Sequence, residues 1–139
     1  MANEIRNVFD VGARALTAQM QRLNTTASNI ANAGAVSSSA EEAFRPLRPV
    51  FDTAFSAAMG DGVLAAPEVE QIVQLDREPI RERRPDSPKA DKDGFVYIAP
   101  INSDEEMVEM VEASRQYQDV LETLSTLRGL MARTLKMGQ

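Results

Sequence analysis

The apolar residues near the start of the chain follow a heptad spacing, and this pattern constrains the fold more than any other feature. Between residues 9 and 30 they are separated alternately by four and three positions, as in a helix that packs along its length against other helices. Gly34 is of the type that most often ends a helix. We therefore expect a helix over residues 3–33, roughly 45 Å long. The stripe consists of Phe9, Ala13, Leu16, Met20, Leu23, Ala27 and Ile30.

This first helix is poor in charge, and its second half is rich in small polar side chains. A free surface helix normally carries more charge on its outer face. Short amide and hydroxyl groups instead favour close packing on several sides, with hydrogen bonds to neighbouring groups. The alternative is a marginal helix that frays in its second half, because these residue types are mediocre helix formers. The polar residues concerned are Asn24, Thr25, Thr26, Ser28, Asn29 and Asn32.

A second long helix is expected over residues 103–137, roughly 52 Å in length. Ser103 and Glu106 fit a capping box, with the serine as N-cap and the glutamate at the third helical position. Acidic residues crowd the start and basic residues the end, which complements the helix dipole. The apolar stripe consists of Met107, Met110, Val111, Ser114, Tyr117, Leu121, Leu124, Met131 and Leu135.

The segment between the helices indicates a small β region interrupted by prolines. Residues 44–55 favour an edge strand or extended arm, residues 68–75 a strand, and residues 95–98 a short strand. We expect a loop at 35–42, a turn at 60–62 and a long loop or extended hairpin tip at 79–93. The predicted fold is α+β, with two long terminal helices forming a coiled-coil-like pair. Its three parts are an N-terminal helix (1–34), a β insert (35–101) and a C-terminal helix (102–139).

The composition of the chain excludes several classes of partner and of chemical site. The net charge is −6 in 139 residues, which argues against nucleic acid as a partner, since phosphate binding needs a basic surface. The absence of Cys and His excludes disulfides, thiol chemistry and zinc sites built on those side chains. No apolar run approaches the length of a membrane span, and no cleaved secretory signal is visible. We expect no cofactor, no metal, no small-molecule substrate and no membrane-spanning segment.

Candidate chemical sites have simpler explanations. The carboxylates of residues 104–106 match the positive end of a helix dipole, which leaves little reason to assign them a catalytic role. The sequence Asp91-Lys92-Asp93-Gly94 could start a calcium loop, but Asn102 stands where such a loop needs its closing glutamate. A turn is the better interpretation. The mixed charges of residues 81–93 indicate a solvated loop or a subunit contact.

Two sequence motifs resemble those of the flagellar rod and hook proteins. The sequence Ala27-Ser28-Asn29-Ile30-Ala31-Asn32 resembles the A-x-N-[IL]-A-N motif of their N-terminal helix. Near the other end, E-M-V at residues 106–108 precedes an A-x-R-x-Y sequence at residues 113–117, as in the C-terminal motif of that family. Residues 8–19, 94–96 and 130–139 are similar to its proximal-rod type. The motif residues are Asn29, Asn32, Ala113, Arg115 and Tyr117.

The resemblance implies a structural, non-enzymatic subunit that polymerises into a tubular drive shaft, carrying torque from the motor to the hook and filament. The shaft would lie in the basal-body rod within the periplasm, reached by the flagellar type III pathway without a cleaved signal. Partners would be copies of this chain, other rod subunits and the proteins at the MS-ring and export-gate junction. The terminal helices would form the inner wall, with the β insert outside.

We predict that apolar side chains on both helices carry the packing between subunits. A different class of function, a soluble coiled-coil adaptor or chaperone-like binding module, also fits two long heptad-striped helices. It would purify as a small defined oligomer with protected termini. The predicted packing residues are Phe9, Leu16, Met20, Leu23, Ile30, Met107, Met110, Tyr117, Leu121, Leu124 and Met131.

Overall fold

The computed structural model describes residues 2–57 and 63–137, with residues 2–7, 53–57 and 63–65 described by their backbone only. Two long helices, α1 (Ala2–Asn32) and α2 (Ser103–Met137), enclose the strands in sequence. These bounds confirm the expected helices to within one residue at each end, and the α+β class with paired terminal helices is confirmed. The turn expected at 60–62 lies outside the described residues.

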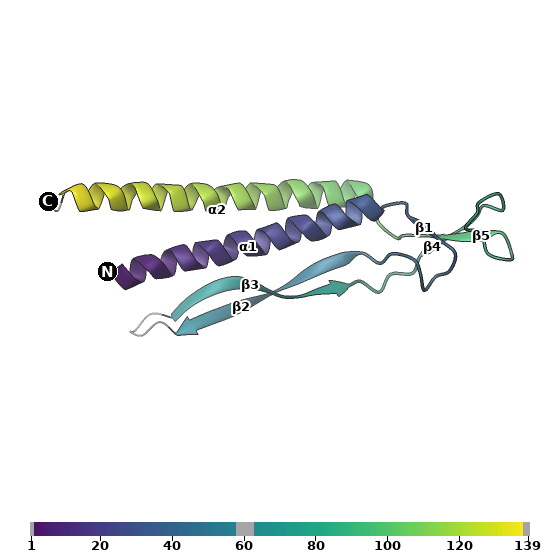
Figure 1. The fold of residues 1–139 in the computed structure, drawn as a ribbon, viewed down its shortest axis with the longest axis horizontal. Helices are drawn as coiled ribbons and strands as arrows, with labels where there is room; N and C mark the ends of the chain where they lie inside the picture. Colours follow the sequence, from purple (N-terminus) through teal and green to yellow (C-terminus); the bar gives the residue numbers. More distant parts are fainter. Residues whose placement is uncertain (1, 58–62, 138–139) are drawn as a thin grey trace.

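The molecule has three elongated layers, and α1 is the middle one (Figure 1). It packs against α2 on one side and against a long hairpin, β2 (Leu47–Ala57) and β3 (Val63–Gln74), on the other. The two helices run antiparallel and come together towards the end of α1 (Figure 1). Coverage on two sides explains why α1 carries few charges, because a charged side chain on either covered face would lose its hydration.

The hairpin pairs β2 with β3 in antiparallel register from Leu47 opposite Gln74 to Ala57 opposite Val63. The register shifts between Val50 and Phe51, where Glu70 is the extra residue on β3. Within the described residues this sheet has two strands, so each strand has one edge that pairs with no other described strand, and prolines within them are tolerated. The hairpin is longer than the expected strands at 44–55 and 68–75.

A second, smaller sheet lies beyond the end of α1. Its order is β1 (Val36–Ser37), β5 (Phe95–Ile98) and β4 (Ile80–Arg83), all antiparallel. Strand β5 confirms the expectation, whereas β4 lies inside the stretch expected as a loop or hairpin tip at 79–93 and β1 lies inside the expected loop at 35–42. The middle of the chain therefore forms two sheets at different places along the molecule.

The turn before β5 is organised by the carboxylate of Asp91. Its Oδ1 accepts hydrogen bonds from the N–H groups of Phe95 at 2.8 Å and Asp93 at 2.9 Å. These bonds, that from Phe95 foremost, lower the pKa of Asp91. Gly94 adopts a φ of 80°, a left-handed conformation that suits glycine. The turn expected at Asp93-Gly94 is therefore confirmed.

The helix ends correct one expectation and confirm another. Asn102 caps α2, because its Oδ1 accepts a hydrogen bond from the N–H of Asp104 at 3.0 Å. The predicted capping box at Ser103 is therefore wrong, and the Glu106 side chain points into the fold instead. Gly34 follows α1 with a φ of 78°, which confirms it as the stop signal.

The buried core is small and made of small side chains. Among residues with described side chains, Val96 is the largest buried hydrophobic residue and the others are alanines. No helix in the described ranges is long and apolar enough to cross a membrane. Because the buried hydrophobic residues are small, the large apolar residues of the helices with described side chains are partly or fully exposed in a single chain. The buried hydrophobic residues are Ala18, Ala43, Ala66, Val96, Ala99 and Ala113.

Candidate assembly surface

A buried asparagine joins three elements near the end of α1. Asn29 is completely buried, and its Nδ2 donates hydrogen bonds to the Leu47 carbonyl at 2.9 Å and to Glu106 Oε2 at 3.0 Å. Its Oδ1 accepts a hydrogen bond from the Leu47 N–H at 2.8 Å. One amide therefore links α1 to the first residue of β2 and to the first turn of α2.

The carboxylate of Glu106 is the charged centre of this junction. Its side chain is buried and receives two hydrogen bonds from Arg48, at 2.9 Å and 2.5 Å. Burial alone would raise the pKa of Glu106, but the hydrogen bonds from Arg48 and Asn29 and the charge of Arg48 lower it below the usual value. The charge is thus compensated, as a buried carboxylate requires.

Along the helix pair, the contact between α1 and α2 is close. Ala113 is completely buried, and a Cβ placed on Gly12 would lie 2.5 Å from Leu124 Cδ2. Arg22 bridges the helices, because its Nε donates to Glu109 Oε1 at 2.6 Å and its guanidinium also binds Gln116 Oε1 at 3.0 Å. Small residues therefore set the helix separation, and one polar cluster fixes the register.

The predicted packing residues divide into two groups. Met20, Met107 and Leu121 are exposed, with exposed fractions of 50%, 56% and 43%. The others are half-buried within the chain. The contact of either group with another subunit stays a prediction. The half-buried group is Phe9, Leu16, Leu23, Ile30, Met110, Tyr117, Leu124 and Met131.

The motif residues also differ in their surroundings. Asn29 and Ala113 are buried, Tyr117 is half-buried, and Asn32 donates from Nδ2 to the Ser28 carbonyl at 2.8 Å within α1. Arg115 is exposed. The two motifs thus meet at one place in space, since Asn29 of the first binds the glutamate that opens the second.

Sequence reasoning missed several residues of the junction. Arg48 stands between Pro46 and Pro49 in a segment that indicated only an edge strand, and nothing there predicts a buried ion pair. The position of Glu106 fits a helix cap, and nothing near it in the sequence indicates a different partner. Gly12 lies inside the heptad stripe, where a glycine can mark a close helix contact. Nothing else in the sequence indicates which helix would approach it.

The outer side of α2 carries an exposed apolar surface. Met107, Val108 and Val111 lie there, and the valines have exposed fractions of 68% and 63%. Together with Arg115 they line a shallow hollow whose remaining walls are the side chains of Glu112, Gln116 and Asp119. Exposed apolar side chains that lie together are typical of a surface that contacts another molecule.

The acidic side chains are also candidate metal ligands. Within residues 2–57 and 63–137, no group of three His, Cys, Asp or Glu side chains could hold a metal ion. The buried carboxylate of Glu106 is hydrogen-bonded to Arg48 and Asn29. What the fold presents to other molecules is a set of helix faces.

Comparison with known proteins agrees with this description at both ends of the chain. Residues 9–34 match the family model described as "Flagella basal body rod protein". Residues 92–137 match the model described as "Flagellar basal body rod FlgEFG protein C-terminal". The class defined by fold, exposed helix faces and these matches is that of the structural subunits of the flagellar rod.

Similarity over the whole chain narrows the class. A flagellar basal-body rod protein FlgC of Yersinia enterocolitica is 36% identical over 96% of this chain and 97% of its own length. The FlgC proteins of Escherichia coli O6:H1 and Aquifex aeolicus are 40% and 31% identical, each over 96% of this chain and 97% and 96% of their own lengths. The chain belongs to the FlgC family of flagellar basal-body rod proteins. It is a non-enzymatic structural subunit of the rod, and this membership sets aside the alternative of a soluble adaptor.

Proposed function

We propose that this chain assembles with copies of itself and with other rod subunits into a tube that acts as a drive shaft. In this tube α1 and α2 form the inner wall, and residues 35–101 lie outside it. The observation that carries the proposal is the exposed apolar surface of the helices, in a chain whose buried hydrophobic residues are five alanines and Val96 among the side chains that the structure describes. Neighbouring subunits supply the cover that the fold does not.

The exposed valines of α2 indicate how much free energy a subunit gains when a neighbour covers them. Burying a side chain such as Val108 or Val111 stabilises by about 1.5–3 kcal/mol relative to leaving it in water. Each subunit presents the same residues, so the gain repeats at every step of growth. Torque then passes through many modest contacts along the shaft, and no single site carries it.

Location and further partners follow from family membership. The shaft would stand in the periplasm, its subunits delivered by the flagellar type III pathway without a cleaved signal. At its base, the chain would contact the proteins at the MS-ring and export-gate junction. Assembly with rod subunits is implied by the family itself, whereas these neighbours are our proposal.

The two groups of packing residues have different roles in this proposal. Half-buried residues such as Leu16, Leu23 and Leu124 hold α1 and α2 together within one subunit. Exposed residues such as Met20, Met107 and Leu121 contact neighbouring subunits. Substitutions in the first group would therefore disturb the fold, and only the second group tests assembly by itself.

The direct test places a charge on the exposed face of α2. The double variant Val108→Asp, Val111→Asp should fold normally, because both side chains are exposed. We expect it to be lost from isolated basal bodies and to abolish swimming in soft agar. The control is Ser38→Asp, which adds one negative charge at an exposed loop position and is compared with each single valine variant as well as with the double variant. Normal incorporation of the double variant would contradict the proposal, provided that circular dichroism shows native helicity.

A further inference from the structure

The last part of α2 has an unusual charge distribution. From residue 123 to residue 137 it contains three basic residues and no acidic one. The helix dipole favours basic residues in the last turn, which accounts for Lys136 but not for Arg128. All three basic side chains, Arg128, Arg133 and Lys136, are exposed.

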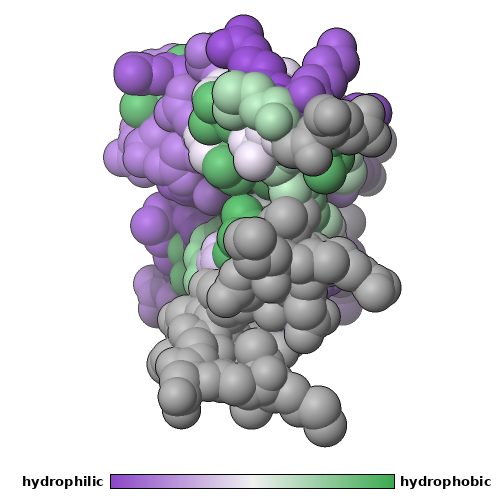
Figure 2. All heavy atoms as spheres, turned by 90° about the vertical axis from the view of Figure 1, so that its left-hand side faces the viewer, coloured by the Kyte–Doolittle hydropathy of each residue, from purple (hydrophilic) through white to green (hydrophobic). Residues whose placement is uncertain are grey.

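Exposed apolar side chains lie among these basic residues. Leu130, Leu135 and Met137 have exposed fractions of 53%, 74% and 81%. Figure 2 looks at this end of the molecule, and hydrophobic residues lie there among hydrophilic ones at the top of the view. We call the surface made by Arg128, Leu130, Arg133, Leu135, Lys136 and Met137 the basic end of α2.

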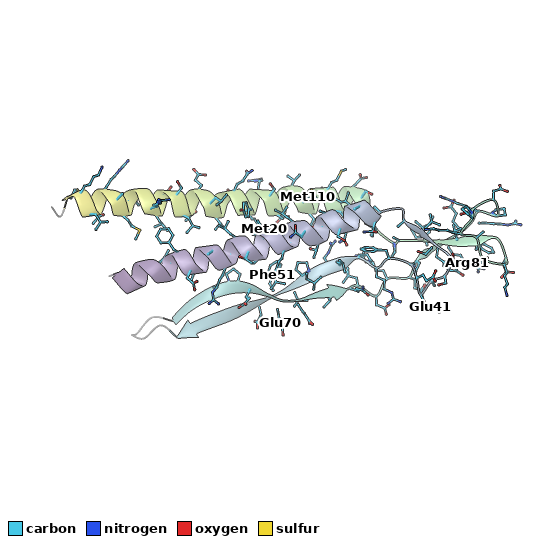
Figure 3. The ribbon with its side chains drawn as sticks, viewed as in Figure 1. Met20, Glu41, Phe51, Glu70, Arg81 and Met110 are labelled. Carbon is cyan, nitrogen blue, oxygen red and sulfur yellow. The ribbon has the colours of Figure 1, made fainter. Side chains whose placement is uncertain are left out.

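The hairpin carries the opposite charge. The only basic residue of β2 and β3, Arg48, is bound to Glu106. Their other charged residues are acidic and exposed; Glu68 pairs with Arg14 of α1 at 3.7 Å, so Glu70 is the carboxylate on which the outer face of the hairpin depends. Ile72 is exposed close to Glu70 on the same strand, with a fraction of 49%. Figure 3 shows Glu70 on the side of the hairpin that faces away from α1. We call the surface around Glu70 and Ile72 the acidic hairpin face.

These two surfaces cannot meet within one chain. The hairpin and α2 are the outer layers of the molecule, and α1 separates them (Figure 1). A contact between two different surfaces of identical copies is heterologous, and it continues into an open helical assembly unless it closes into a ring. That is the type of contact a growing shaft needs.

We propose that the acidic hairpin face of one copy docks onto the basic end of α2 of the next copy. This inference rests on the proposed function and adds the partner surfaces to it. The apolar residues would form the centre of the contact, and the charges would form a rim that sets its orientation. The opposite charge of the basic end of α2 identifies it as the partner of the acidic hairpin face, because two acidic surfaces would repel each other.

Charge reversal tests the pairing. Glu70→Lys alone, and the triple variant Arg128→Glu, Arg133→Glu, Lys136→Glu alone, should each lower incorporation into basal bodies by roughly tenfold, because each variant places like charges opposite each other across the contact. Combining all four substitutions should restore most of the lost incorporation, because opposite charges then face each other again. Glu41→Lys is the control, since Glu41 is exposed at the other end of the molecule (Figure 3). Normal incorporation of both single-surface variants, or no rescue by the combination, would overturn the inference.

Cross-linking gives a second readout that does not depend on charge. The chain has no cysteine, so Ile72→Cys combined with Leu135→Cys introduces the only two thiols. In isolated basal bodies, a short bismaleimide should link neighbouring copies of this variant. Glu41→Cys with Leu135→Cys should give no link. If the first pair incorporates normally but does not cross-link, the docking is refuted, while the rod function stands and is judged by the valine variant above.

Discussion

At the scale of single residues, the junction around Asn29 shows what the sequence could and could not predict. The resemblance identified Asn29 as a motif residue, but its role depends on Leu47, eighteen positions away, whose backbone it binds twice. An asparagine suits this place because its amide supplies a donor and an acceptor together. Glu106 satisfied a local cap rule, and its true partner, Arg48, is brought close only by the complete fold.

The charge of Glu106 makes stability depend on pH in a defined direction. Its pKa is lowered in the folded chain, so its contribution is fully present above the unfolded-state value of about 4.3 and is lost as pH falls through the folded value. Glu106→Gln removes this titration and weakens two hydrogen bonds from a charged donor, at a cost of about 2 kcal/mol at pH 7.

Urea unfolding at several pH values measures this effect. The difference in free energy of unfolding between the natural chain and Glu106→Gln should shrink as the pH is lowered through the acidic range. Glu41→Gln, at an exposed site, controls for the general loss of carboxylate charge. A difference that stays constant from pH 7 to pH 3 would show that the carboxylate of Glu106 is not stabilised by its partners.

At the scale of elements, helices were predictable and strands only in part. Heptad spacing repeats over many turns, so the bounds of α1 and α2 follow from local sequence. Strand β4 was missed because its side chains are all exposed, and a strand without a buried face shows no apolar alternation. The hairpin was foreseen only as separate strands, since pairing between β2 and β3 is not encoded in either alone.

The helix contact predicts opposite effects for two glycine substitutions. Gly12→Ala must displace the Leu124 side chain, and overpacking of this kind costs about 1–3 kcal/mol. Replacing glycine with alanine inside a helix gains about 1 kcal/mol or less from helix propensity, so the net effect should be a loss of stability. Gly129→Ala meets no atom within 4 Å, so it should gain that propensity alone. Thermal unfolding followed by circular dichroism should show a lower midpoint for the first and a higher midpoint for the second. Equal shifts in the same direction would show that the helices are not in close contact at Gly12.

At the scale of the whole molecule, the contacts are distributed unevenly along the long axis. One end holds the Asn29 junction and the Arg22 cluster, which tie α1 to α2 and, at the junction, to β2. Towards the other end α2 keeps exposed apolar side chains and no described ion pair. Local stability follows contact density, so opening should begin at this second end in a single subunit.

Amide hydrogen exchange can follow this gradient. In the purified chain, amides of residues 103–113 should exchange slowly and those of residues 123–137 quickly, because only the first stretch is anchored by buried side chains. In isolated basal bodies, neighbouring subunits should cover the second stretch, and its protection should rise to match the first. Uniform protection along α2 in the free chain would show that the helix needs no neighbour for its order. Unchanged fast exchange of residues 123–137 in the rod would show that assembly does not use this end. That result would count against the hairpin contact proposed for it, whereas the valine variant still tests the proposed function.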